Sequence, residues 1–418
     1  MKAEIIAIGS ELLTPFRQDT NSLFLTAELN KLGIEVSRKC VVGDDAAQLR
    51  EAFREALGRA ELVIGMGGLG PTEDDLTRET VAELLGRRLV RDEEIVRAMQ
   101  ERFRRFRREM PETNLRQAMV PEGATPLPNP RGTAPGLWME TGGHIVVLLP
   151  GPPAELKPMF TESVEKRLAE RSRGVWLLTR ELRVAGVPES EVDAKIAPIY
   201  RAAAGVETTI LASPGEIQIH LRAWAGNRAA AEKALDGLAE KIRQALGDTV
   251  FTMRGESLEE VVAAALAEAR ATIAVAESCT GGQVAERLTS IPGSSNYFLG
   301  GVVSYANEMK TAWADVPAAV LKTHGAVSGE VARAMAEGIR RSTGATLGLG
   351  ITGIAGPGGA TPEKPVGTVH IALAAEGETK ERRFLFPGDR EIVRRQASQR
   401  ALDLVRRYFE NRGKDIRK

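Results

Sequence analysis

The sequence contains few of the residues that build metal centres and disulfide frameworks. It has 2 cysteines and 4 histidines among 418 residues. Cys40 and Cys279 alone make neither a disulfide framework nor a four-ligand zinc site, and the histidines show no ligand spacing. This composition is typical of a reducing cytoplasm, where we expect the protein to reside.

Net charge and long apolar runs are also missing. Lysine plus arginine and aspartate plus glutamate each number 56, so no overall charge attracts the chain to nucleic acid or to an anionic membrane. The first apolar run is interrupted at Glu11, and no run approaches the roughly 18 apolar residues of a membrane span. We therefore expect a protein that is neither exported nor membrane-spanning, with no membrane partner.

Three segments of different pattern follow one another along the chain. From residue 1 to about 172, short β-rich runs alternate with helical stretches, which is typical of parallel βαβ units. From about 173 to 252, a strand, a helix, two alternating strands and a long helix predict a small α+β module. From about 253 to 418, a second α/β pattern begins. The predicted fold class is therefore α/β multidomain.

Two polar stretches have a structural interpretation. Every second residue from Glu216 to Arg222 is polar, and we expect these residues to form the solvated face of a strand rather than a binding surface. Residues 100–110, QERFRRFRREM, interleave arginine with Phe103 and Phe106. Because glutamates dilute this basic stretch, we interpret it as a solvated amphipathic helix rather than an RNA-binding segment.

Residues 62–77, LVIGMGGLGPTEDDLT, combine a glycine-rich bend with a run of acids. Gly65–Gly70 match the G-x-G-x-x-G pattern, which favours a dinucleotide at a helix N-terminus. The carboxylates of Glu73, Asp74 and Asp75 would repel a phosphate unless a cation lay between them. The glycines also follow the third predicted strand, whereas the redox dinucleotide pattern belongs to the first βα turn.

The stretch AESCTGG, residues 276–282, places Ser278 at the end of a strand and before a helix. Free N–H groups at a helix N-terminus can stabilise an oxyanion, so Ser278 is a candidate nucleophile. The alternative is that Ser278 only caps the helix. Cys279 competes as a nucleophile, but its side chain should point to the other side of the turn, and no histidine lies nearby in sequence to activate it.

A reactive serine needs a base, and the segment SYANEMK supplies Tyr305 and Lys310. A lysine can take a serine proton when burial or a neighbouring cation lowers its pKa, with the tyrosine as a relay. An exposed lysine beside a rim tyrosine is the alternative interpretation. Further along, Thr352 lies among glycines, and a basic helix offers Arg390 with Arg394 and Arg395 for a bidentate phosphate contact. Together these residues favour acyl transfer on a phosphorylated substrate.

These motifs resemble a known family over nearly the whole chain. The C-terminal segment resembles the nicotinamide mononucleotide deamidase domain of the CinA family in five ordered motifs: AESCTGG, SYANEMK, HGAVS (324–328), GITGIAGP and KPVGTVH (364–370). The first segment resembles the N-terminal CinA domain, which has the molybdopterin-binding fold of the MogA and MoaB proteins, in four motifs: IGSELL (8–13), VVGDD (41–45), GGLGPTEDDLT and PGPPAEL (150–156). The middle segment resembles a KH-like module, although it shows no G-x-x-G loop, so RNA binding is not carried over.

The resemblance implies three domains. Residues 1–172 would form a MogA/MoaB-like parallel α/β sandwich, residues 173–252 a KH-like α+β linker module, and residues 253–418 an α/β deamidase domain. It also implies a homodimer.

For the last domain, the resemblance implies hydrolysis of nicotinamide mononucleotide to nicotinate mononucleotide and ammonia, without a cofactor. Ser278 would be the nucleophile, and Tyr305 with Lys310 its activating pair. The residues implied to bind the substrate are Thr280, Gly281, Thr352, Gly353 and Arg390.

For the first domain, the resemblance implies cleavage of the pyrophosphate of ADP-ribose with a divalent metal. Asp75 would be catalytic, and backbone amides of the glycines would meet the diphosphate, while the acids hold a cation that bridges it. The implied metal ligands are Glu11, Asp45, Asp74 and Asp75, and the implied substrate contacts are Gly67, Gly68, Gly70 and Gly151.

Three other functions stay open at this point. The N-terminal fold also suits an enzyme of pterin cofactor maturation that binds molybdopterin. The second is a competence-linked scaffold, although neutral net charge argues against nucleic acid as its partner. A redox dinucleotide domain has Asp92 in its favour, at about the separation expected of a ribose ligand.

Overall fold

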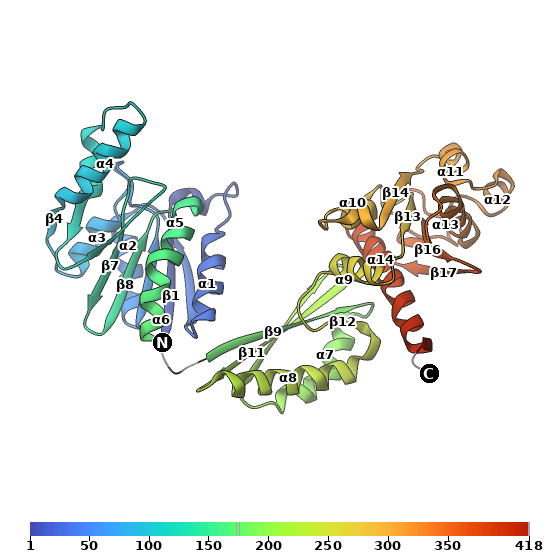
Figure 1. Cartoon of the computed structure of the whole chain (residues 1–418), viewed down its shortest axis with the longest axis horizontal. Coiled ribbons are helices and arrows are strands. Elements are labelled where there is room, and N and C mark those ends of the chain that lie inside the picture. Colours follow the sequence, from blue (N-terminus) through green and yellow to red (C-terminus); the bar gives the residue numbers. More distant parts are fainter. Residues whose placement is uncertain (173, 175, 417–418) are drawn as a thin grey trace. The chain divides into compact units, whose positions relative to one another are not determined.

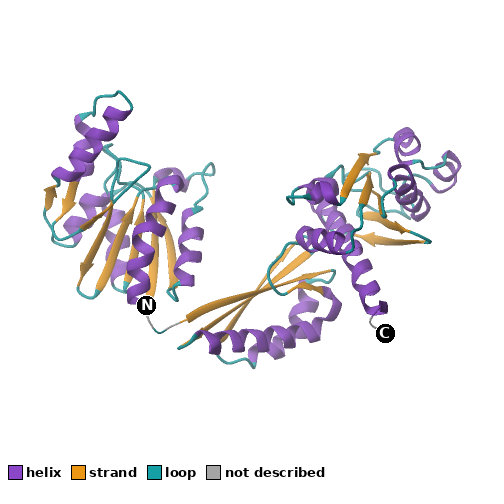
Figure 2. Ribbon diagram, viewed as in Figure 1, coloured by secondary structure: helices purple, strands orange, loops and turns teal. Residues whose placement is uncertain are grey.

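The computed structural model describes residues 1–172, 174 and 176–416 (Figures 1 and 2). The chain divides into two compact units, Met1–Leu178 with Ala223–Ala234, and Thr179–Arg222 with Leu235–Lys418. Among the described residues, no helix is long and apolar enough to cross a membrane.

The N-terminal domain is built on a six-stranded sheet with strand order β2-β1-β3-β8-β7-β6. Its parallel strands are β1 (Lys2–Ile8), β2 (Glu35–Val42), β3 (Leu62–Met66) and β8 (His144–Leu149). Its antiparallel strands are β6 (Thr125–Leu127) and β7 (Gly136–Thr141). The sheet is therefore mixed rather than parallel throughout, because a two-residue turn at Gly142 and Gly143 folds β8 back on β7.

Helices cover both faces of this sheet, as the alternating pattern predicts. On one face, Leu25 and Phe160 pack on the strands, and on the other face Phe53 and Val81 do so. The helices are α1 (Asn21–Lys31), α2 (Ala46–Leu57), α3 (Thr77–Leu84), α4 (Glu93–Arg105), α5 (Pro153–Met159) and α6 (Glu165–Arg171). A small separate sheet pairs β4 (Leu89–Arg91) with β5 (Met119–Pro121).

The middle module is a four-stranded sheet of order β10-β11-β9-β12 with two helices. Its elements are β9 (Trp176–Ala185), α7 (Glu189–Arg201), β10 (Val206–Ser213), β11 (Glu216–Ala225), α8 (Arg228–Leu246) and β12 (Val250–Thr252). The alternation predicted for β11 is confirmed, with Ile217, Ile219 and Leu221 buried.

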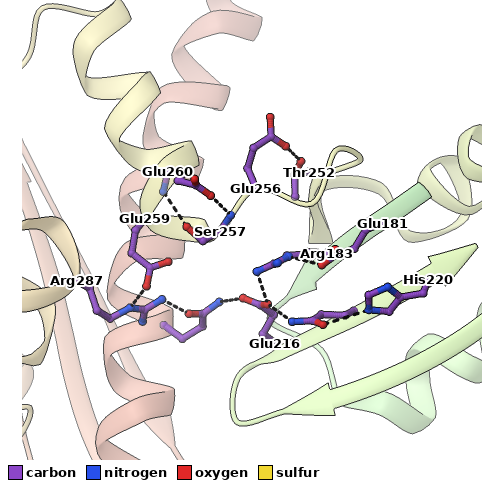
Figure 3. A network of polar contacts seen from close by, with 12 residues as sticks. Glu181, Arg183, Glu216, His220, Thr252, Glu256, Ser257, Glu259, Glu260 and Arg287 are labelled. Carbon is purple, nitrogen blue, oxygen red and sulfur yellow. Dashed lines mark hydrogen bonds and ion pairs between the residues drawn. The ribbon is translucent and has the colours of Figure 1, made fainter. Parts of the chain in front are cut away.

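The polar face of β11 is half-buried rather than fully solvated, because it takes part in a network of polar contacts (Figure 3). Glu216 accepts hydrogen bonds from Arg183 at 3.3 Å and from Gln399 at 3.0 Å. Gln399 also accepts a hydrogen bond from Arg287, which pairs with Glu259. This chain of contacts joins the middle module to helices of the last domain.

The C-terminal domain has a five-stranded sheet of order β14-β13-β15-β16-β17. The first three strands in this order are parallel: β14 (Phe298–Val303), β13 (Ile273–Glu277) and β15 (Leu347–Gly353). Strands β16 (Thr368–Ala375) and β17 (Glu378–Leu385) are antiparallel. The helices are α9 (Leu258–Glu268), α10 (Gln283–Thr289), α11 (Asn307–Ala314), α12 (Ala318–His324), α13 (Gly329–Thr343) and α14 (Arg390–Ile416).

Helix α13 packs unusually close to β15 because the strand presents glycine to it. A Cβ atom on Gly348 would lie 2.1 Å from the carbonyl oxygen of Ala336, and one on Gly350 would lie 2.3 Å from that of Ala332. Since these obstacles are backbone atoms, an added methyl group cannot be accommodated by a side-chain rotation. The close contact fixes β15, whose carboxyl end contributes to the site described below.

We predict that Gly348→Ala destabilises the C-terminal domain by about 3 kcal/mol, because the new methyl group separates α13 from β15. Scanning calorimetry of the full chain measures this as a lower unfolding temperature of that domain. Gly237→Ala is the matched control, since nothing lies within 4 Å of its added Cβ in α8, and it should leave stability unchanged or raise it by up to about 1 kcal/mol. Equal transitions for the two variants would contradict the packing argument.

Candidate active sites

The C-terminal site lies where three parallel strands end. Ser278 follows β13, Ser304 follows β14, and Thr352 stands near the end of β15. The carboxyl ends of neighbouring parallel strands meet at one edge of the sheet, which is where ligands of α/β folds bind.

Glu277, and not Ser278, caps the helix that follows. The buried carboxylate of Glu277 accepts hydrogen bonds from the amides of Gly282 at 3.0 Å, Val284 at 3.2 Å and Ala285 at 2.8 Å. A carboxylate at a helix N-terminus satisfies free N–H groups and interacts favourably with the helix dipole. The hydroxyl of Ser278 is therefore not used as a cap, which was its alternative interpretation.

The side chain of Lys310 comes from α11 and is buried, with 2% of the residue exposed. Its Nζ donates to Ser278 Oγ at 3.0 Å, to the carbonyl of Ser304 at 2.9 Å and to the carbonyl of Tyr305 at 3.0 Å. Burial lowers the pKa of Lys310, because a charged ammonium loses its hydration there. Among the hydrogen bonds and ion pairs of the described residues, this amine has no carboxylate partner.

This arrangement suits a proton that moves between serine and lysine. A neutral amine has two N–H groups and one lone pair, so the two carbonyls take the N–H groups and the lone pair faces Ser278 Oγ. After it accepts the serine proton, the ammonium has three donors for the same three acceptors. Both protonation states of Lys310 are thus satisfied without rearrangement.

Cys279 is excluded as the nucleophile by its position. It packs within the apolar core of the domain and is 4% exposed. Burial raises the pKa of its thiol to about 12, so the reactive thiolate is not available near neutral pH. The prediction that this side chain points to the other side of the turn is confirmed.

Tyr305 contacts Lys310 through its backbone and not through its ring. Its side chain is exposed, and its hydroxyl accepts a hydrogen bond from Arg390 Nη2 at 2.8 Å. The other guanidinium nitrogen, Nη1, donates to the carbonyl of Gly356 at 2.8 Å. Arg390 therefore joins Tyr305 to the loop after β15.

The other residues inferred to bind substrate in this domain have specific structural contacts. Thr352 donates to the carbonyl of Ala326 at 2.7 Å, which ties the HGAVS segment to β15. Thr280 is fully buried, and its hydroxyl has no hydrogen-bond partner among the described residues. Its carbonyl accepts from Arg394 at 2.8 Å, and a Cβ on Gly281 would lie 3.2 Å from the same guanidinium. Gly353 packs against Val369, since a Cβ there would lie 2.7 Å from that side chain.

The N-terminal site is a cavity of about 540 Å³ at the carboxyl ends of β1, β3 and β8. The predicted glycines line it together with acids and with two arginines, Arg102 and Arg131, which form its basic wall. Its lining includes Glu11, Asp44, Gly67, Gly68, Gly70, Asp74, Asp75, Arg102, Arg131, Thr133 and Gly151. At Gly67, φ is +113° and a Cβ would lie 2.1 Å from the carbonyl of Ile8, so glycine is required for this bend.

The acids of this cavity have distinct contacts. Asp75 Oδ2 accepts from the amide of Thr72 at 2.9 Å and from its hydroxyl at 2.5 Å. Hydrogen bonding to Thr72 lowers the pKa of Asp74, with a further contribution from its own backbone amide. Within residues 1–172, 174 and 176–416, no three histidine, cysteine or acidic residues come together in a group able to hold a metal ion.

The sequence reading selected Asp45 at this rim, and the structure places Asp44 there instead. Asp45 caps α2, where its Oδ1 accepts from the amides of Ala47 at 3.0 Å and Gln48 at 2.9 Å. Asp44 lines the cavity and accepts from the amide of Ser10 at 2.7 Å. An aspartate directly before a helical pattern is typical of a helix N-cap. Of the neighbours Asp44 and Asp45, the second directly precedes the helix, so the sequence alone indicates that Asp45 is the cap and that Asp44 is free to line the cavity.

Sequence reasoning also missed the basic wall of the cavity and two residues of the C-terminal site. Arg102 and Arg131 lie in a helix and a loop that carry no motif, and only the fold brings them to the glycines. Glu277 precedes the candidate serine directly, and Ser304 acts through its backbone carbonyl. Because every residue has a backbone carbonyl, the residue type at a position does not indicate such a contact.

Comparisons with known proteins agree with these domains. Residues 4–170 match the family model described as a probable molybdopterin binding domain, residues 179–252 match the damage-inducible protein CinA KH domain, and residues 255–409 match the CinA C-terminal domain. The predicted fold, a MogA/MoaB-like domain, a KH-like module and a CinA C-terminal domain, is thereby confirmed.

Relatives match almost from end to end. A CinA-like protein of Koribacter versatilis is 52% identical over 411 residues, which cover 97% of this chain and 99% of the relative. A putative competence-damage inducible protein of Desulforudis audaxviator is 45% identical and covers 98% of this chain and 99% of its own. A crystal structure of a CinA protein of unknown function from Thermoplasma acidophilum is 37% identical and covers 40% of this chain and 97% of its own, with a TM-score of 0.37. The chain therefore belongs to the CinA family.

Proposed function

We propose that the C-terminal site is an amidohydrolase site that converts nicotinamide mononucleotide and water to nicotinate mononucleotide and ammonia. The observation that carries the reaction class is the buried pair of Lys310 Nζ and Ser278 Oγ, 3.0 Å apart. The choice of substrate rests on the motif resemblance to the deamidase domain of the family.

The proposed reaction has two stages. In the first, neutral Lys310 takes the proton of Ser278 while Oγ attacks the carboxamide carbon, and the protonated lysine then gives this proton to the departing nitrogen, which leaves as ammonia. An ester joins Ser278 to the nicotinoyl group. In the second stage, water attacks the ester carbon and Lys310 accepts its proton, which returns to Oγ as the ester bond breaks.

The remaining groups of the site support binding and charge stabilisation. An oxyanion that develops on the substrate would need N–H groups other than the amides of Gly282, Val284 and Ala285, because Glu277 already accepts hydrogen bonds from these three. Arg390, Arg394 and Arg395 provide positive charge for the substrate phosphate, and the first two still have N–H groups beyond those already bonded.

For the N-terminal site we propose hydrolysis of the diphosphate of ADP-ribose, with a divalent cation. The acids fit such a cation, because Mg²⁺ prefers oxygen ligands and is held by one or two carboxylates together with substrate phosphates and water. Asp44 and Asp74, which line the cavity together with the glycine bend, would hold it. When bound, the cation would neutralise the diphosphate and help to generate the attacking hydroxide.

The residues of this chain would bind and orient the diphosphate. In this proposal, amides of the bend from Gly68 to Gly70 would meet its oxygens, and Arg131, which also lines the cavity, would pair with it. Asp75, fixed by Thr72 through one oxygen, has its second oxygen to orient the attacking water. The water oxygen bonds to one phosphorus, and the bridging P–O bond breaks.

The first prediction concerns the nucleophile. Ser278→Ala should lower ammonia release from nicotinamide mononucleotide by about a thousandfold or more, because no other nucleophile is available. ADP-ribose cleavage by the same variant should stay within about threefold, since the two sites belong to separate domains and share no residue. Equal loss of both activities would refute separate sites.

The second prediction concerns pH. Because the neutral amine is the base and burial lowers the pKa of Lys310, kcat/KM for the amide should rise with pH to a midpoint below the ordinary value of lysine. Lys310→Arg should abolish this activity, since arginine stays protonated. Tyr305→Phe, which retains the carbonyl that holds Lys310, should keep the midpoint. A midpoint at or above the ordinary lysine value would contradict the assignment.

The third prediction concerns the cation. Treatment with a strong chelator should abolish ADP-ribose cleavage, and added Mg²⁺ should restore it, while ammonia release is unaffected. Chromatographic detection of AMP and an ammonia assay on one sample measure both. Full ADP-ribose cleavage by the chelated protein would disprove the metal-dependent reaction.

A further inference from the structure

An aromatic pocket lies directly beside the N-terminal cavity. It has a volume of about 410 Å³ and is lined by Arg102, Phe103, Phe106, Arg108 and Thr133. In Figure 1, α4, which carries the first two of these residues, lies beyond the end of the sheet that is remote from the N-terminus. Phe106 follows α4 directly and is 68% exposed, which is unusual for a phenylalanine that serves only packing.

The aromatic pocket and the N-terminal cavity share part of their lining. Arg102 and Thr133 line both. Arg102 donates to the carbonyl of Pro130 at 3.0 Å and to that of Arg131, so α4 is fastened to the loop that forms the basic wall of the cavity. Asn129 also holds this loop, through the amides of Arg131 at 3.0 Å and Gly132 at 2.7 Å. The two hollows therefore share a built wall.

We propose that this pocket is the subsite for the purine base of the dinucleotide. The inference rests on the proposed ADP-ribose hydrolysis, because it places one end of that substrate. Exposed aromatic faces stack on a nucleobase, and arginines contribute cation–π contact with its ring. A diphosphate held at the glycine bend leaves the attached nucleoside to extend past Arg102 and Thr133 into the aromatic pocket.

The assignment explains features that a solvated helix does not. The two rings lie three positions apart, so they stand on one side of α4 and its C-terminal end. Acids line the cavity, Glu155 among them, whereas the aromatic pocket is lined by two arginines, two phenylalanines and a threonine. The cavity therefore suits the diphosphate with its cation, and the aromatic pocket suits the base. The subsite selects nucleotides over diphosphates without a base.

Titration calorimetry of the full chain with Mg²⁺ tests the subsite, using ADP and methylenediphosphonate as probes. Phe106→Ala should weaken ADP binding by about tenfold, which corresponds to the stacking of one base, and should leave methylenediphosphonate binding unchanged. Phe106→Tyr retains the ring and should bind ADP like the wild type. Arg97→Ala, on α4 outside the pocket lining, should not change either probe.

The outcomes separate the subsite from the reaction. Unchanged ADP binding by Phe106→Ala, equal weakening of both probes, or no ADP binding by the wild type would each overturn the subsite. If ADP binding follows the prediction but the wild type does not cleave ADP-ribose, the subsite holds and the proposed reaction is wrong.

Discussion

A buried carboxylate determines which groups at the end of β13 are free for chemistry. Glu277 satisfies three amides at the start of α10, so the helix needs no hydroxyl as a cap. Ser278 is thereby left to meet Lys310, and Cys279 turns into the apolar core. Three successive side chains thus have three separate tasks. Without the acid, the serine hydroxyl would be drawn toward the helix amides, and its contact with the lysine would compete with capping.

The two proposed sites would reach their reactivity by opposite physical routes. In the C-terminal domain, burial of an amine that has no carboxylate partner within the described part of the chain favours the neutral base, and two backbone carbonyls fix its orientation. In the N-terminal domain, acids stand at an open cavity lined by a glycine bend, which suits an anion accompanied by a cation. The proposed amidohydrolase site would need water excluded from around its base, and the proposed diphosphate site would need the added positive charge of a cation.

The local sequence pattern predicted the helices and strands well, but it predicted less well how the strands pair. The alternation of β11 and the three-part division follow from periodicity, which is a local property. The hairpin of β7 and β8 was not predicted, although Gly142 and Gly143 mark its turn. The alternation of strands and helices in this segment favoured a sheet that is parallel throughout. In the sites, Ser278 and Lys310 were named from motifs, whereas Asp44, Arg102 and the carbonyl of Ser304 depend on tertiary placement. Contacts made by backbone atoms or by residues outside motifs cannot be read from residue type alone.

The central claim is that Ser278, activated by Lys310, forms a covalent bond to the substrate acyl group. Rapid acid quench during turnover of nicotinamide mononucleotide, followed by peptide mass spectrometry, measures this directly. The account predicts a nicotinoyl ester on the peptide that contains Ser278, and its absence from the Lys310→Arg variant. A nicotinoyl thioester on Cys279, or an adduct that forms at an undiminished rate without the lysine amine, would contradict it.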